Sequence, residues 1–81
     1  MTPMEILVRD LKATNLTCIV DNTILDDPRY NWTLDEMAHH IAIFVHEAMT
    51  LDYGFSDFDY DTCVEETRKA LSALNLSVLK N

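Results

Sequence analysis

Apolar residues along most of this chain recur every three or four positions, which is the spacing of one face of an α-helix. The clearest such stripe comprises Leu34, Met37, Ala38, Ile41, Phe44, Val45 and Ala48. Thr33 and Glu36 have the spacing of a capping box at its start. We therefore predict a helix that begins after Thr33 and ends near Thr50 or Leu51.

A shorter stripe near the amino terminus predicts a first helix. Thr2 and Glu5 form a capping box, and Pro3 occupies the first helical position, where its missing amide proton costs nothing. The apolar side chains that follow at helical spacing are Met4, Leu7, Val8 and Leu11. We expect this helix to end near Thr14.

Residues 16–25 fit two patterns. Their β-branched side chains favour a strand, and Asp21-Asn22 has the composition of a tight hairpin turn. The same segment also has apolar residues at helical spacing, namely Leu16, Ile19, Val20 and Ile24. We interpret it as a short hairpin or extended segment, followed by a loop around Pro28, which disfavours helix in the residue before it.

A further helix is predicted in the last third of the chain, with two possible starts. Thr62 and Glu65 form one capping box, and Ser56 with Asp59 forms a weaker one. Asn75 is a plausible helix end, since asparagine tolerates the left-handed conformation that often follows a last turn. The apolar face of this predicted helix comprises Cys63, Val64, Ala70, Leu71 and Leu74.

Together these elements predict a mainly α, three-helix small domain with a possible short β-hairpin or extended segment between helices one and two. Residues 76–79 form either a last turn or a short strand that pairs with the segment at 16–20. The length of 81 residues suits one domain that spans residues 1–81.

Charge narrows the classes of partner. The net charge is -8, from 14 acidic and 6 basic residues. Binding to nucleic acid or to an anionic membrane relies on lysine and arginine, so we expect neither as a direct partner. The amino terminus lacks the basic-then-apolar layout of a signal peptide, which favours a cytoplasmic protein. Arg29 is the one base between Asp21 and Glu66, so the negative charge is concentrated there.

The stretch GFSDFDYDTCVEE, residues 54–66, interleaves acids with aromatics. Spaced carboxylates can imitate a phosphate track and steer a protein onto a basic surface, and aromatics supply anchors. The predicted partner-binding residues are Asp52, Phe55, Asp57, Phe58, Asp59, Tyr60, Asp61, Glu65 and Glu66. An alternative interpretation is structural, with acids in the first turn of a helix and aromatics in the core.

The leading functional prediction is therefore a non-enzymatic interaction protein, a small acidic inhibitor or regulator of a nucleic-acid-binding protein. Phage-encoded inhibitors of such proteins often have this size and charge, which is an analogy of class. The first alternative is a homodimer or other oligomer that pairs through the outer face of the second predicted helix. That face comprises Glu36, His39, Ile43, His46 and Glu47.

A second alternative is a metal-binding helical protein. Asp57, Asp59 and Asp61 resemble the start of a calcium loop, but Thr62 and Arg68 stand where that loop needs glycine and a bidentate glutamate. The histidines His39, His40 and His46 share one predicted helix and are expected to be exposed to solvent. We therefore expect no metal cofactor.

Catalytic chemistry has little support. Cys63 falls on an apolar stripe beside acidic residues, which would raise the pKa of its thiol and make it a poor nucleophile. The chain has one glycine, so it has no glycine-rich phosphate loop. We expect no enzymatic activity and no organic cofactor, and we expect Cys18 and Cys63 to be buried, reduced thiols.

Overall fold

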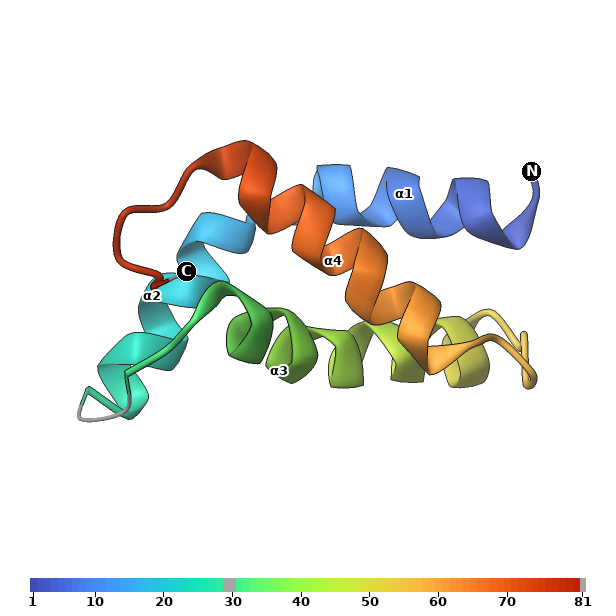
Figure 1. The fold of residues 1–81 in the computed structure, drawn as a ribbon. Helices are drawn as coiled ribbons and strands as arrows, with labels where there is room; N and C mark the ends of the chain where they lie inside the picture. Colours follow the sequence, from blue (N-terminus) through green and yellow to red (C-terminus); the bar gives the residue numbers. More distant parts are fainter. Residues whose placement is uncertain (29–30, 81) are drawn as a thin grey trace.

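The computed structural model describes residues 1–28 and 31–80 and confirms that the protein is mainly α-helical (Figure 1). Within those residues it contains four α-helices and one π-helical turn, and it contains no strand. These elements are α1 (Pro3–Ala13), α2 (Leu16–Asp26), α3 (Leu34–Glu47), η1 (Ala48–Asp52) and α4 (Tyr60–Leu74). The predicted count of three helices is therefore wrong.

The two clearest predicted helix starts are confirmed. At α1, the Glu5 amide donates to Thr2 Oγ1 at 3.2 Å, and the Thr2 amide donates to the Glu5 carboxylate at 2.9 Å. The same reciprocal pair joins Thr33 and Glu36 at α3, at 3.0 and 3.1 Å. Each capping box satisfies amide groups that have no partner within the helix.

The hairpin predicted for residues 16–25 is wrong, because this segment forms α2. The Asn15 side chain caps the helix by accepting the Cys18 amide at 3.1 Å. Leu16 and Val20, four residues apart, are buried in the main core, and Ile19 packs against it. Burial of this helical face outweighs the weak strand preference of the β-branched side chains, which lies within about 1 kcal/mol on measured scales.

α4 begins at neither of the two predicted capping residues. Asp59 is the N-cap, and its carboxylate accepts both the amide and the hydroxyl of Thr62, at 3.0 and 2.9 Å. Thr62 therefore lies inside the first turn, and Ser56 lies in the preceding loop. The predicted end is confirmed, since Asn75 adopts the left-handed conformation, with φ of 54°.

The carboxyl-terminal tail turns back onto the start of α3. Leu79 is buried, and the Lys80 amide donates to the Trp32 carbonyl at 3.0 Å. The Leu34 amide in turn donates to the Lys80 carbonyl at 2.7 Å, which makes an isolated bridge between Thr33 and Lys80. The tail thus forms turns that hold the end of the chain, and it does not pair with residues 16–20.

α3 and α4 are the central pair, with α1 beside α4 and α2 at the opposite end (Figure 1). Two apolar clusters fill the interior. The first comprises Leu16, Val20, Met37, Ala38, Ile41, Leu71 and Leu79. The second comprises Leu7, Leu11, Ala42, Met49, Cys63 and Val64.

The predicted apolar stripe of α3 is correct except at Phe44. This side chain is 59% exposed, whereas Ala42 is fully buried. The face of α3 that packs against α4 includes positions four residues apart, such as Ala38 and Ala42. Ala38 belongs to the first apolar cluster and Ala42 to the second, and both clusters also contain residues of α4. Phe44 is left at the edge of the core, where its ring packs on His40 with centroids 5.7 Å apart.

Among the residues that the structure describes, no helix combines the length and the apolar character that a membrane span requires.

Candidate protein-binding surface

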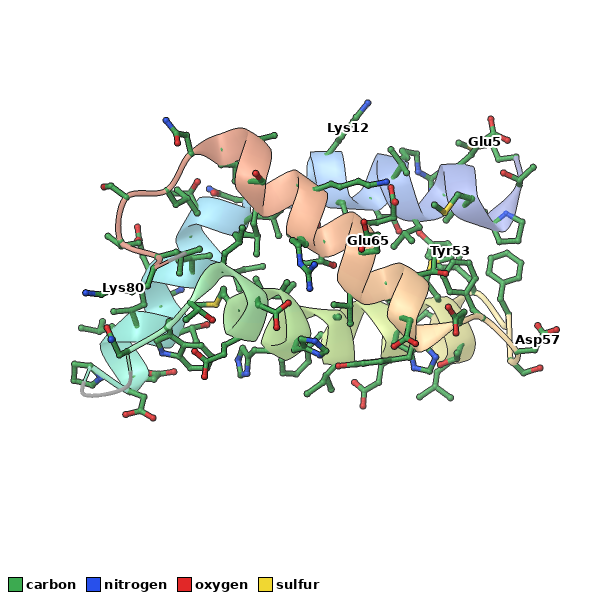
Figure 2. The ribbon with its side chains drawn as sticks, in the orientation of Figure 1. Glu5, Lys12, Tyr53, Asp57, Glu65 and Lys80 are labelled. Atoms are coloured by element: carbon green, nitrogen blue, oxygen red, sulfur yellow. The ribbon has the colours of Figure 1, made fainter. Side chains whose placement is uncertain are left out.

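The predicted site lies at one end of the molecule, where α1 begins and the loop after η1 turns into α4. Figure 2 shows Glu5, Tyr53 and Asp57 at this end. The last turn of the preceding helix widens into η1, with the Tyr53 amide donating to the Ala48 carbonyl at 3.0 Å. The chain then turns at Gly54, whose φ of 78° is a backbone conformation that glycine adopts without steric cost.

The aromatic residues of this loop are partly buried. Phe55, Phe58 and Tyr60 all pack against the second apolar cluster. The Tyr60 hydroxyl donates to the His39 carbonyl at 3.2 Å, which fixes the start of α4 on α3. These three side chains therefore anchor the loop, and each leaves only part of its ring exposed to solvent.

The predicted carboxylates divide into two groups. Asp59 is committed to the cap of α4, and Glu66 pairs with Lys69 at 3.0 Å with its side chain only 14% exposed. The others are exposed or solvent-facing and make no hydrogen bond or ion pair within the described residues. They are Asp52, Asp57, Asp61 and Glu65, which we call the acidic surface.

The bases near the acidic surface are already engaged. Arg9 donates to Asp10 at 3.1 Å, and Arg68 pairs with Asp35 on α3. Lys69 is held by Glu66, one turn away on α4. Each of these cations has a carboxylate of its own, and Lys69 also interacts electrostatically with Glu65. Among the described residues, the charges of Asp52, Asp57 and Asp61 are therefore left without a nearby cation.

A tyrosine links the first helix to the loop at this end. The Tyr53 hydroxyl donates to the Asp10 carboxylate and accepts from Arg9 at 3.2 Å. The hydrogen bond from Tyr53 lowers the pKa of Asp10, and the bond to Asp10 raises the pKa of Tyr53. Arg9 has its pKa raised, chiefly by its hydrogen bond to Asp10. The tyrosine ring also stacks on Phe55, with centroids 6.1 Å apart.

The predicted oligomer face of α3 is only partly available. Glu36 is committed to the capping box of α3, and the His46 ring donates from Nε2 to the Phe58 carbonyl at 2.8 Å. His46 is thus half-buried, which corrects the expectation that it faces solvent. Ile43, which is 50% exposed, Glu47 and His39 remain on the surface.

The remaining histidines do not assemble a metal site. His39 is exposed, 3.9 Å from the Asp35 carboxylate, while His40 is half-buried with its ring at the edge of Trp32. Among the described residues, no three histidine, cysteine or acidic side chains are grouped so that they can hold a metal ion.

The two cysteines differ from each other. Cys63 is buried, and desolvation raises the pKa of its thiol to about 11, with a further contribution from Asp59. The thiol therefore stays protonated at neutral pH and is a poor nucleophile. Cys18 is exposed on α2, so the expectation that both thiols are buried is wrong for this residue.

Two apolar grooves flank the elbow between α1 and α2. One, of about 280 Å³, lies between α1, α2 and α3. The other, of about 470 Å³, lies between the elbow and α4 and has Lys12, Glu66 and Lys69 along its wall. Neither groove can be predicted from the sequence, because the positions of α1 and α2 that line them come together only in the folded chain.

Comparison of the chain with protein-family models, with curated proteins and with solved structures finds no match.

Proposed function

We propose that this chain is a non-enzymatic protein-binding module whose acidic surface binds a basic surface of another protein. The proposed partner class is a nucleic-acid-binding protein, because such proteins carry clustered lysine and arginine that meet phosphate. Occupying that basic surface gives the chain the role of an inhibitor or regulator.

The observation that carries this proposal is the sorting of charge at one end of the molecule. Asp52, Asp57 and Asp61 of the acidic surface have no counter-ion among the described residues, while Arg9, Arg68 and Lys69 are each paired with another carboxylate. A field of one sign over a surface accelerates association with a partner of the opposite sign and fixes its orientation.

Because the aromatic residues of the loop are half-buried, we expect electrostatic attraction to contribute more to this binding than apolar contact does. Phe55 and Phe58 are committed to the second apolar cluster, so they offer limited new contact area to a partner. Electrostatic attraction at solvent-exposed positions is screened within about 10 Å at 0.1 M salt. We therefore expect association through the acidic surface to be fast and strongly dependent on salt.

The proposal is tested by titrating isotope-labelled protein with a short polylysine peptide and following backbone amide resonances. We expect the largest shifts between residues 51 and 66, and we expect them to vanish above about 0.3 M salt. Shifts of equal size over residues 21–27 would show a general response to net charge and would count against the proposal.

A matched pair of variants separates the surface from the total charge. The first carries Asp52→Asn, Asp57→Asn and Asp61→Asn. The second removes three aspartates at the other end that have no partner among the described residues, by Asp21→Asn, Asp26→Asn and Asp27→Asn. We expect only the first to lose peptide affinity, and equal losses in the two would contradict a localised site.

A further inference from the structure

The larger groove beside the elbow lies between α1, the start of α2 and α4, and we call it the α4 groove. Its volume of about 470 Å³ falls within the usual range of sites that bind small molecules. Its apolar walls include Leu11 of α1, Leu16 of α2 and Leu74 of α4, and the small side chains of Ala70 and Ala73 leave space between them. The α4 groove can therefore accommodate the apolar part of a small molecule.

Part of this apolar lining is open to water. Figure 1 shows the end of α1 beside α4, with α2 leaving from that end. Leu11 and Leu16 are buried there, whereas Leu74 is 45% exposed. An apolar chain that covers Leu74 removes this surface from water, which favours binding.

The charged residues that line the α4 groove are two lysines and one glutamate. Lys69 donates to Glu66 at 3.0 Å, and the Glu66 side chain is only 14% exposed, so these two charges compensate each other. Lys12 lines the groove without an acidic partner among the described residues. Figure 2 shows its side chain extending from α1 into solvent, where a flexible four-carbon stem leaves the ammonium group able to meet a ligand at the mouth.

The acids near the α4 groove are engaged with cations. Asp10, which precedes Lys12 on α1, is paired with Arg9. Glu65, the member of the acidic surface next to Glu66 on α4, does not line the groove and interacts with Lys69. Among the residues that line the groove, the surplus charge is therefore positive, although the whole chain has a net charge of -8.

We propose that the α4 groove binds a fatty acid, with the apolar chain along the leucine walls and the carboxylate at Lys12. A few polar groups in an apolar site typically orient the ligand, and Lys12 has this role here. A cationic amphiphile would instead bring a charge of the same sign to Lys12. The inference goes beyond the proposed function, because it concerns another surface and a small molecule.

The smaller groove, between α1, α2 and α3, provides a comparison within the same molecule. Its one charged lining residue is Asp10, which is held by Arg9 and Tyr53. This groove offers no cation to a carboxylate, so we expect no preference for an anion there.

The test titrates isotope-labelled protein with decanoate and with 1-decanol, which has the same chain length without the charge. We follow backbone amide resonances and expect the largest shifts with decanoate at Thr17 and Leu74, which line the α4 groove. Exposed ion pairs are modest in strength, so we expect decanoate to bind about fivefold more tightly than 1-decanol. The proposal is overturned if decanoate does not bind, if the two affinities are equal, or if the largest shifts fall at Phe44 and Val45 of the smaller groove.

Two matched pairs of variants locate the site. Lys12→Gln should lose the preference for decanoate, whereas Lys80→Gln, which removes a lysine outside the groove, should keep it. Ala73→Phe should fill the groove and abolish binding, whereas Ser72→Phe places the same bulk on α4 outside the groove lining. All four positions are exposed, so we expect the amide spectra to remain those of a folded protein. Binding that survives Ala73→Phe, or equal effects within either pair, contradicts the proposed site.

A further comparison separates this inference from the proposed function. The variant with Asp52→Asn, Asp57→Asn and Asp61→Asn should lose affinity for polylysine and bind decanoate as the wild type does. If it loses both, the α4 groove is not a separate site and the inference fails. If the wild type binds polylysine but not decanoate, the α4 groove fails alone.

Vesicles of phosphatidylglycerol distinguish a free fatty acid from a membrane as the source of the apolar chain. A net charge of -8 opposes contact with an anionic membrane surface, so we expect the protein to stay in solution when the vesicles are sedimented. Sedimentation of the protein with the vesicles would make a membrane lipid the occupant and overturn the proposal.

Discussion

Asp59 shows how one side chain in an acidic stretch is committed to the fold. Its carboxylate accepts two hydrogen bonds from Thr62, in the first turn of α4. Asp57, two residues earlier, is exposed in the loop and has no such role. Neighbouring aspartates of the same sequence pattern therefore divide into one that stabilises a helix and one that is available to a partner.

These different roles predict how substitutions at Asp59 and Asp57 change the free energy of unfolding. Asp59→Ala should lower the free energy of unfolding by about 1 kcal/mol, while Asp59→Asn should retain most of it because asparagine also caps helices well. Urea unfolding at neutral pH measures both values. Asp57→Ala is the control and should leave stability unchanged; a similar loss at Asp57 and Asp59 would refute the cap as the cause.

At the scale of elements, α2 shows the competition between local preference and burial. Asp21 and Asn22 have the composition of a hairpin turn but lie in the middle of a helix. The helix is held by the Asn15 cap and by burial of Leu16 and Val20 in the main core. A hairpin at this place would have no neighbouring strand, since the described part of the chain contains none, and isolated hairpins are marginal in water.

Substitutions at Asn22 distinguish a helix from a hairpin, because alanine and glycine have opposite effects on the stability of the two conformations. In a helix, Asn22→Ala should be more stable than Asn22→Gly by about 1 kcal/mol, because glycine is the poorer helix former. In a hairpin the order reverses, since Asp-Gly favours the tight turn. Thermal unfolding followed by circular dichroism measures the order, and Asn22 is exposed, so packing does not confound the comparison.

At the scale of the whole molecule, polar contacts join both ends of the described chain to its middle. Tyr53 and Asp10 are 43 residues apart in sequence, and their hydrogen bond holds the first helix against the loop that carries the acidic surface. At the other end, Lys80 and Trp32 hold the tail on α3. These contacts add to the two apolar clusters, which pack the helices against one another.

The Tyr53–Asp10 contact predicts a pH-dependent stability difference. The pKa of Asp10 is lowered in the folded state, so its contribution is present at neutral pH and is lost as the pH falls through the ordinary value of 3.8 and below. Tyr53→Phe should therefore be less stable than the wild type at pH 7, with the gap narrowing in this acidic range. Urea unfolding at a series of pH values gives the gap directly.

Tyr60→Phe is the matched control for that measurement. Its hydroxyl donates to the His39 carbonyl and to no carboxylate, so the stability that it loses should not vary over the same acidic range. A gap for Tyr53→Phe that is equally constant would show that Asp10 does not carry the effect.

The sequence by itself determined the features that depend on residues near one another. The helical class followed from apolar periodicity, the starts of α1 and α3 from Thr2 and Thr33 with their partners three residues later, and the end of α4 from Asn75. Such features are decided by contacts within a few residues, which a pattern records directly.

Only the tertiary structure decided which face of each element is buried and which charges are paired. α2 is a helix because Val20 on one of its faces is buried in the first apolar cluster. Phe44 is exposed because α4 covers the neighbouring face of α3. Arg68 of α4 is paired with Asp35 of α3, which only folding brings beside it. Burial and pairing depend on the positions of other elements, so the acidic surface and the two grooves beside the elbow between α1 and α2 form only when the helices are assembled.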